Sequence, residues 1–227
     1  MLFEKDNEQT STETDLQLLR HKIIVETQEE ERMTIGSALH DSVAQLLYGI
    51  RLNLQYHILQ HGDRERFMNV KSMLNEAIQQ VRNISMELYP SMLSEFGLAQ
   101  SIRAMANRFS LPDFQIVVMA QSFLDHLPGN MQLAIYRIVQ ELLNNAMKHA
   151  AADQVLIRIT ERKGKIYIQV TDNGNGFEKN VSSCVANGTG IRNIRYRIKL
   201  YNGLMRIRTN QTKIQGTTVS IYLNPPK

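Results

Sequence analysis

The sequence predicts an α+β protein in which a long helical hairpin is followed by an α/β sandwich, a mixed sheet with helices on one face. Two observations indicate this fold. Before Pro90, apolar residues recur at three- and four-residue steps with almost no proline or glycine. After Pro90, helical patterns alternate with β-branched runs that end in turn residues. We expect a disordered acidic tail over residues 1–15, the hairpin over 16–92 and the sandwich over 96–224.

The hairpin consists of two predicted amphipathic helices, over residues 15–60 and 64–88. Gly62-Asp63 separates them and Pro90 stops the second. Such a hairpin cannot bury its own apolar stripe, so we expect two copies to pair as a dimeric four-helix bundle. The stripe comprises Leu16, Leu19, Ile23, Ile35, Leu39, Leu46, Ile50 and Leu54, then Phe67, Val70, Met73, Leu74, Ile78, Val81 and Ile84.

The predicted sandwich contains three helices and five strands. We expect its last helix to place Ile191, Ile194, Ile198 and Tyr201 inward and the turn Lys163-Gly164 to join two strands. The helices are predicted over residues 97–109, 131–150 and 191–201, and the strands over 114–120, 154–163, 165–173, 204–210 and 217–223.

Composition excludes several classes of protein. The hydrophobic content of 43% is typical of a globular chain, and no apolar run reaches the ~18 residues that a membrane span needs. A single cysteine, Cys184, excludes an internal disulfide framework, so we expect a cytoplasmic chain without membrane contact of its own, either a whole protein or the cytoplasmic part of a membrane-bound one. The net charge is +4, but the bases of the C-terminal part form no run and no aromatic stacking set accompanies them. This pattern disfavours nucleic acid as a partner and favours a small polyanion such as ATP.

His40 is the first candidate for chemistry. It lies inside the first predicted helix, followed by Asp41 and then by Gln45. A neutral imidazole is a nucleophile near neutral pH, and an adjacent carboxylate can hold one ring N–H while the other nitrogen attacks phosphorus. Gly36, Ser37 and Ala44, one turn away, are small and leave room for a bulky reactant. The alternative is an ordinary surface histidine of a coiled coil.

A second cluster begins in the helix predicted over residues 131–150. Glu141, Asn145 and either Lys148 or His149 share one face of this helix. Mg²⁺ bound to a triphosphate needs few protein ligands, so the Asn145 carbonyl, with Glu141 acting through water, would suffice. The alternative is a polar helix face, although paired asparagines are poor choices for that purpose.

The remaining candidates follow strands or open a helix. Asp172 ends a strand, where its carboxylate can accept from an exocyclic amine, and Gly174 and Gly176 let backbone approach a base. Gly188, Thr189 and Gly190 open a helix whose N-terminal amides suit phosphate oxygens. Thr217 follows Gly216 and offers a hydroxyl beside the base. The order of these segments is far more specific than any one glycine pair.

Residues 29–224 resemble the sensor histidine kinases of two-component signalling, in the subclass of the nitrate and membrane-fluidity sensors. ERMTIGSALHDSVAQLLYGI resembles the phosphoacceptor helix, and VRNISMELYPSMLSEFGLAQSI resembles the exit from the second helix. YRIVQELLNNAMKHA, DNGNG, GTGIRNI and GTTVSIYL resemble the four boxes of the Bergerat ATP-binding fold. Thr34 departs from the subclass, which usually has arginine there.

The resemblance implies an enzyme, a protein-histidine kinase that uses ATP and Mg²⁺, forms a homodimer and transfers phosphate to the receiver domain of a response regulator. It implies that His40 accepts phosphate, that Asp41 is the general base and that Gln45 positions water for dephosphorylation of the regulator. Glu141 and Asn145 would serve catalysis and Mg²⁺, Asp172 would bind the adenine amine, and the glycines of 174–190 would form an ATP lid. A chaperone-like ATPase and a catalytically inactive dimeric scaffold are the two alternatives.

Overall fold

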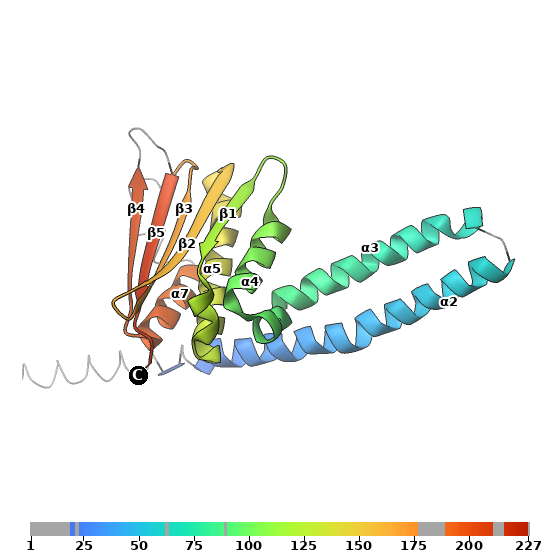
Figure 1. The fold of residues 1–227 in the computed structure, drawn as a ribbon, viewed down its shortest axis with the longest axis horizontal. Helices are drawn as coiled ribbons and strands as arrows, with labels where there is room; N and C mark the ends of the chain where they lie inside the picture. The colour runs from blue at the N-terminus through green and yellow to red at the C-terminus, as the bar shows by residue number, and fades with distance from the viewer. Residues whose placement is uncertain are drawn as a thin grey trace, which may run out of the picture. The chain divides into compact units, whose positions relative to one another are not determined.

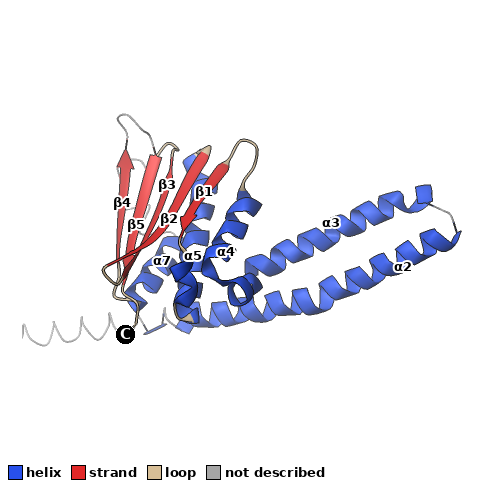
Figure 2. Cartoon of the chain, in the orientation of Figure 1, coloured by secondary structure: helices blue, strands red, loops and turns tan. Residues whose placement is uncertain are grey.

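The computed structural model describes residues 19–20, 23–61, 64–88, 90–176, 189–210 and 216–226. These residues form two compact units, one ending at Ser91 and the other beginning at Met92. The first unit is helical and the second combines helices with a five-stranded sheet (Figures 1 and 2). The predicted combination of a helical hairpin and an α/β sandwich is confirmed, and the expected tail over residues 1–15 lies outside the described part.

The helical unit is an antiparallel hairpin. Its first arm is helical over residues 23–38, becomes a π-helix over Leu39–Ala44 (η1) and continues as α2 over Gln45–His61. The second arm is α3, over Arg64–Leu88, with the predicted bounds. The π-helical stretch was not predicted, because an apolar stripe does not distinguish one wider turn from the α-helical turns beside it.

Contacts between the two arms are partly polar. The Ser85 hydroxyl on α3 donates to the carbonyl of Gly36 over 2.8 Å, and both residues are buried. The Arg82 guanidinium lies over the ring of Tyr48, and the rings of His57 and Phe67 meet edge to face. Among the described residues of this unit, only Val25, Ala44 and Ile78 are buried apolar residues, so this part of a single copy has little core of its own.

The α/β unit begins with α4, over Ser91–Phe109. The predicted helix began at Gly97, but α4 starts earlier and is interrupted at this residue, where φ is 79°. A side chain at Gly97 would also collide with Asp125, whose carboxylate accepts from the backbone N–H of Ala99 over 3.0 Å. Asp125 lies in the short 3₁₀-helix η2 (Ser122–His126), another element that was not predicted. It caps the second half of α4 from a different segment of the chain.

The sheet has the order β1-β2-β3-β5-β4. β1 and β2 are parallel, because the 3₁₀-helix, α5 (Gly129–Asn145) and its π-helical extension η3 (Ala146–Ala150) connect them, whereas the other pairs are antiparallel. β2 and β3 turn at Lys163 and Gly164, which both have positive φ, as the two-residue hairpin predicted. The strands cover Gln115–Ala120, Gln154–Arg162, Lys165–Asp172, Leu204–Asn210 and Gly216–Leu223 for β1 to β5.

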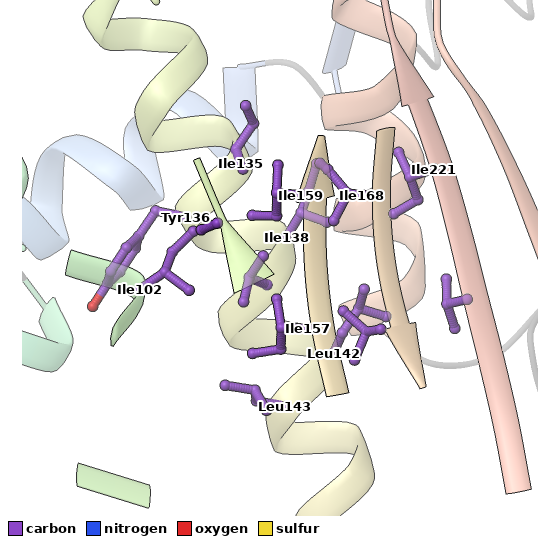
Figure 3. Close-up of a cluster of buried hydrophobic side chains, with 14 of the residues drawn as sticks. Ile102, Ile135, Tyr136, Ile138, Leu142, Leu143, Ile157, Ile159, Ile168 and Ile221 are labelled. Atoms are coloured by element: carbon purple, nitrogen blue, oxygen red, sulfur yellow. The ribbon is translucent and has the colours of Figure 1, made fainter. Parts of the chain in front are cut away.

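The core lies between one face of this sheet and the helices α4, α5 and α7 (Thr189–Leu200). Alternate strand residues face the helices, and Ile157, Ile159, Ile168 and Ile221 are almost fully buried there (Figure 3). Ile194 and Ile198 of α7 are buried, while Ile191 and Tyr201 pack against the core, as predicted. This packing fixes α5 and the end of β3 beside each other.

Candidate functional site

His40 lies within the π-helix η1 and is exposed, with 55% of its side chain accessible. Its Nδ1 lies 2.9 Å from Oδ1 of Asp41. The other oxygen of Asp41, Oδ2, accepts a hydrogen bond from the Ser37 hydroxyl over 3.1 Å. Hydrogen bonds from His40 and then Ser37 lower the pKa of Asp41 below its ordinary value, so the carboxylate is ionised near neutral pH.

An ionised carboxylate only accepts hydrogen bonds, so Nδ1 of His40 must carry the hydrogen. The neutral ring then has its free lone pair on Nε2, the nitrogen that Asp41 does not touch. The arrangement therefore presents one defined nucleophilic atom. The sequence predicts a nucleophilic histidine at this position but does not indicate which ring nitrogen reacts.

Gln45 begins α2, at the end of the π-helical turn, and its side chain is exposed. Gly36 and Ala44 are buried and Ser37 is partly buried, so two of the three small residues expected around His40 belong to the packed side of the arm. Thr34 donates its hydroxyl to the carbonyl of Glu30 within its own helix over 2.9 Å. Among the described residues of this region, His40, Asp41 and Ser37 are linked to one another by side-chain hydrogen bonds.

A cleft beside α5 holds the second cluster and has about 560 Å³ of empty space, part of it open to solvent. Leu142, Asn145, Ala146 and His149 line it from one face of α5 and η3. We call it the α5 cleft. Its other lining residues are Ala150, Val170, Asp172, Gly176, Ile191, Ile207, Thr217 and Val219.

Asp172 closes one end of this cleft. Its Oδ1 accepts from the backbone N–H groups of Gly174 and Thr217, each over 3.1 Å. No other described residue bonds to its second oxygen, which stays available to a donor in the cleft. The carboxylate is thus held from two strands, β3 and β5, with one acceptor left for a ligand.

At two positions around Asp172, only glycine fits, because the backbone of another segment comes too close to leave room for a Cβ. A Cβ at Gly174 would collide with the carbonyl of Ala150, and one at Gly216, where φ is 138°, would collide with the carbonyl of Asp172. Gly176, at φ 73°, lies against Thr209. The glycines therefore keep the loop after β3 close to the end of η3 and to β5, which shapes this end of the cleft.

Asn145 and Glu141 differ in their surroundings. The Nδ2 of Asn145 is buried and has no hydrogen-bond partner among the described residues, so it can donate to a bound oxygen. Glu141 is not among the residues that line the α5 cleft; its carboxylate lies against Gly190, where any Cβ would overlap it. The structure therefore places Glu141 beside the start of α7 rather than in the lining of the α5 cleft.

Among the other predicted site residues, some line the α5 cleft and others do not. His149 lines the cleft and Lys148 does not, although both are exposed. Thr217 is buried at the cleft, with its backbone N–H on Asp172. Gly188 lies outside the described residues, and of Thr189 only the backbone in α7 is described. In the described part of the chain no three His, Cys, Asp or Glu side chains gather into a metal-binding group.

The apolar walls of the cleft were not predicted as site residues. Leu142 and Ala146 were predicted only as part of a helix, and Val170, Ile207 and Val219 only as parts of strands. The signal was present in part, because Leu142, Asn145, Ala146 and His149 follow each other at helical steps of three and four. Apolar walls with a carboxylate among them suit an aromatic base.

Two family descriptions match this chain. The family "Histidine kinase" matches residues 31–93, which include His40, and the family "Histidine kinase-, DNA gyrase B-, and HSP90-like ATPase" matches residues 130–227, which include the α5 cleft. The chain carries the two domains of a histidine kinase. The second family implies that the domain binds ATP.

Sensor histidine kinases are also its relatives. The chain is 28% identical over 224 residues to the sensor histidine kinase MctS of Rhizobium johnstonii, covering 96% of this chain and 48% of MctS. It is 27% identical to the signal transduction histidine-protein kinase/phosphatase DegS of Brevibacillus brevis, over 88% of this chain and 53% of DegS. For the sensor histidine kinase ComP of Bacillus subtilis the identity is 27%, over 89% of this chain and 28% of ComP. The chain thus spans about half the length, or less, of these relatives.

Solved structures support the fold of the histidine kinase domains. The histidine kinase domain of a blue-light activated histidine kinase from Erythrobacter litoralis superposes with a TM-score of 0.52 and 18% identity, over 79% of this chain and 95% of that one. Among the described helices of this chain, none is long and apolar enough to cross a membrane.

Proposed function

We propose that this protein is the kinase core of a two-component sensor, which phosphorylates itself on His40 from ATP and passes the phosphate to an aspartate of a response regulator. The observation that carries this proposal is the exposed imidazole whose Nδ1 bonds to Asp41, which leaves Nε2 as the nucleophile. The α5 cleft, in a domain of the ATP-binding family, provides the phosphoryl donor.

In the proposed reaction, Nε2 of His40 attacks the γ-phosphorus of ATP. An N–P bond forms and the P–O bond to ADP breaks. The ring would become an imidazolium, and Asp41 stabilises it by accepting the Nδ1 hydrogen bond and then the proton. Asp41 suits this role because two hydrogen bonds keep it ionised.

In the α5 cleft, we assign the adenine amine to the free oxygen of Asp172 and the base to the apolar walls. Asn145, whose Nδ2 is unpaired, would donate to the phosphates, and its carbonyl would be a ligand for Mg²⁺. When bound, Mg²⁺ would neutralise charge on the phosphates that develops in the transition state. Glu141 is placed beside the start of α7, where it can act on the ion through water. Lys148, His149 and the segment around Gly188 and Thr189 complete the expected phosphate contacts.

The proposed partners are a second copy of the chain and the receiver domain of a response regulator. The dimer is supported by apolar side chains of the hairpin that one copy leaves exposed, among them Leu46, Ile50, Val70 and Met73. Phosphatase activity on the regulator is supported by similarity to DegS, which is named a kinase/phosphatase. Gln45 is the residue proposed to orient the attacking water, because an amide both donates and accepts without taking the proton.

Substitutions in the first arm test the separate roles proposed for Asp41 and Gln45. Asp41→Asn should depress autophosphorylation by about 10²-fold or more, since the general base is lost. Gln45→Ala should leave autophosphorylation nearly intact and slow the removal of phosphate from the cognate regulator. Both rates are measured with γ-labelled ATP and with purified phosphorylated regulator.

Ser42→Ala is the matched control, because Ser42 lies between the two residues in the sequence and is exposed. Its kinase and phosphatase rates should equal those of the wild type. The opposite pattern, with Gln45 essential for autophosphorylation and Asp41 dispensable, would overturn the roles proposed here.

A further inference from the structure

Asp41 needs outside support to reach His40. Consecutive residues of a helix point in different directions, so neighbours in the sequence do not normally face each other. The Nδ1–Oδ1 distance of 2.9 Å therefore requires one particular orientation of the Asp41 carboxylate. Both side chains are more than half exposed, and packing does not hold them.

Ser37 provides that support. It lies four residues before Asp41, on the same side of the helix, and its hydroxyl donates to Oδ2 over 3.1 Å. With Oδ2 held by Ser37, Oδ1 is directed at the imidazole. The two oxygens of one carboxylate thus serve one neighbour each.

The turn that carries Ser37 is itself attached to the second arm. The buried Ser85 of α3 donates to the carbonyl of Gly36, the residue directly before Ser37. The backbone at the start of the π-helical turn is therefore fixed to a neighbouring helix rather than only to its own. Ser37 thereby acts from a defined position.

We propose that Ser37 is a positioning residue for the phosphoryl transfer: it orients Asp41 so that His40 keeps its hydrogen on Nδ1 and its lone pair on Nε2. This inference rests on the proposed function. Ser37 touches neither substrate nor the reacting nitrogen and acts through Asp41. Its loss frees the carboxylate to rotate toward solvent, and the imidazole then populates both neutral forms.

The direct test is the tautomer of His40, measured without nucleotide. In the dimeric protein with ¹⁵N-labelled histidine, long-range ¹H–¹⁵N spectra distinguish protonated from unprotonated ring nitrogens, and His40→Gln identifies the His40 signals. The wild type should show Nδ1–H, and Ser37→Ala should shift part of the population to Nε2–H. Ser37→Thr keeps the hydroxyl and should restore the wild-type spectrum.

Ser42→Ala is the matched control, since it makes the same change within the π-helical turn at a hydroxyl that has no hydrogen bond to Asp41. It should leave the spectrum unchanged. In parallel, autophosphorylation of Ser37→Ala should fall by about three- to tenfold in kcat with an unchanged KM for ATP, as expected for loss of one hydrogen bond to a charged group.

Equal tautomer populations in Ser37→Ala and Ser42→Ala would overturn the proposal, and so would a shifted tautomer with an unchanged rate. The spectra do not depend on phosphorylation. A wild-type protein that shows the Nδ1–H form but acquires no label on His40 would therefore contradict the proposed function, while the tautomer shift in Ser37→Ala would still test the orientation of Asp41 by Ser37.

Discussion

At the scale of single residues, Asp172 gives the sharpest prediction about the nucleotide. Its Oδ1 is used by two backbone donors, so Asp172→Asn can keep both bonds through the amide oxygen and replace only the free oxygen with a donor. A donor there opposes the adenine amine and matches the guanine carbonyl. Calorimetry should show that the wild type prefers ATP over GTP by about tenfold or more.

In Asp172→Asn the affinity for ATP should drop by a similar factor and the preference for ATP should narrow. Unfolding of the ligand-free variant near the wild-type temperature serves as the control for an intact fold. Equal affinities of the wild type for ATP and GTP would count against the assignment of Asp172 to the base.

Some of these residues could be predicted from the sequence and others could not. His40, Asp41, Asn145 and Asp172 became candidates because of their helical spacing and because of the order of the segments that carry them. The link from Ser37 to Asp41 was not, because serine at that spacing is common and only the side-chain geometry reveals the bond. The position of Glu141 outside the α5 cleft depends on how α7 packs on α5, which no local pattern encodes.

At the scale of elements, the hairpin leads to a prediction about assembly. Val43, Leu46 and Ile50 on the first arm and Val70, Met73 and Ile84 on α3 remain exposed in one copy at helical spacing. A stripe of this extent exposes a large apolar surface unless a second copy covers it. Light scattering at micromolar concentration should therefore give the mass of a dimer.

Ile50→Glu should shift this equilibrium toward the monomer, because a charge would be buried in the shared core. Gln55→Glu is the control, since it adds the same charge to an exposed position on the opposite side of α2. A monomeric wild type, or equal effects of the two substitutions, would contradict the proposed bundle.

The bounds of α3, β3 and β4 followed the sequence patterns within about one residue, because proline, glycine and strand alternation mark them. The π-helical stretches Leu39–Ala44 and Ala146–Ala150 were not predicted by any sequence pattern. The first interrupts the helix of the first arm at His40, and the second follows α5 directly after Asn145. A wider turn costs regular hydrogen bonding and is common at functional sites. It arises from packing between elements, so the local sequence does not indicate it.

At the scale of the whole molecule, the proposed nucleophile lies in one unit and the proposed nucleotide cleft in the other. Neither unit alone distinguishes a kinase from its alternatives. A chaperone-like ATPase would use the α5 cleft and not His40, and an inactive scaffold would use the hairpin and not the cleft. In the proposed reaction, the phosphate of ATP bound in the α5 cleft must reach Nε2 of His40.

The most direct measurement is the site and chemistry of the phosphate after incubation with γ-labelled ATP and Mg²⁺. A phosphoramidate is lost in acid and survives base, unlike phosphoserine. We expect an acid-labile label that is absent from His40→Gln and present in His57→Gln, which serves as a control on the same arm. An acid-stable label, or a label that persists in His40→Gln, would contradict it.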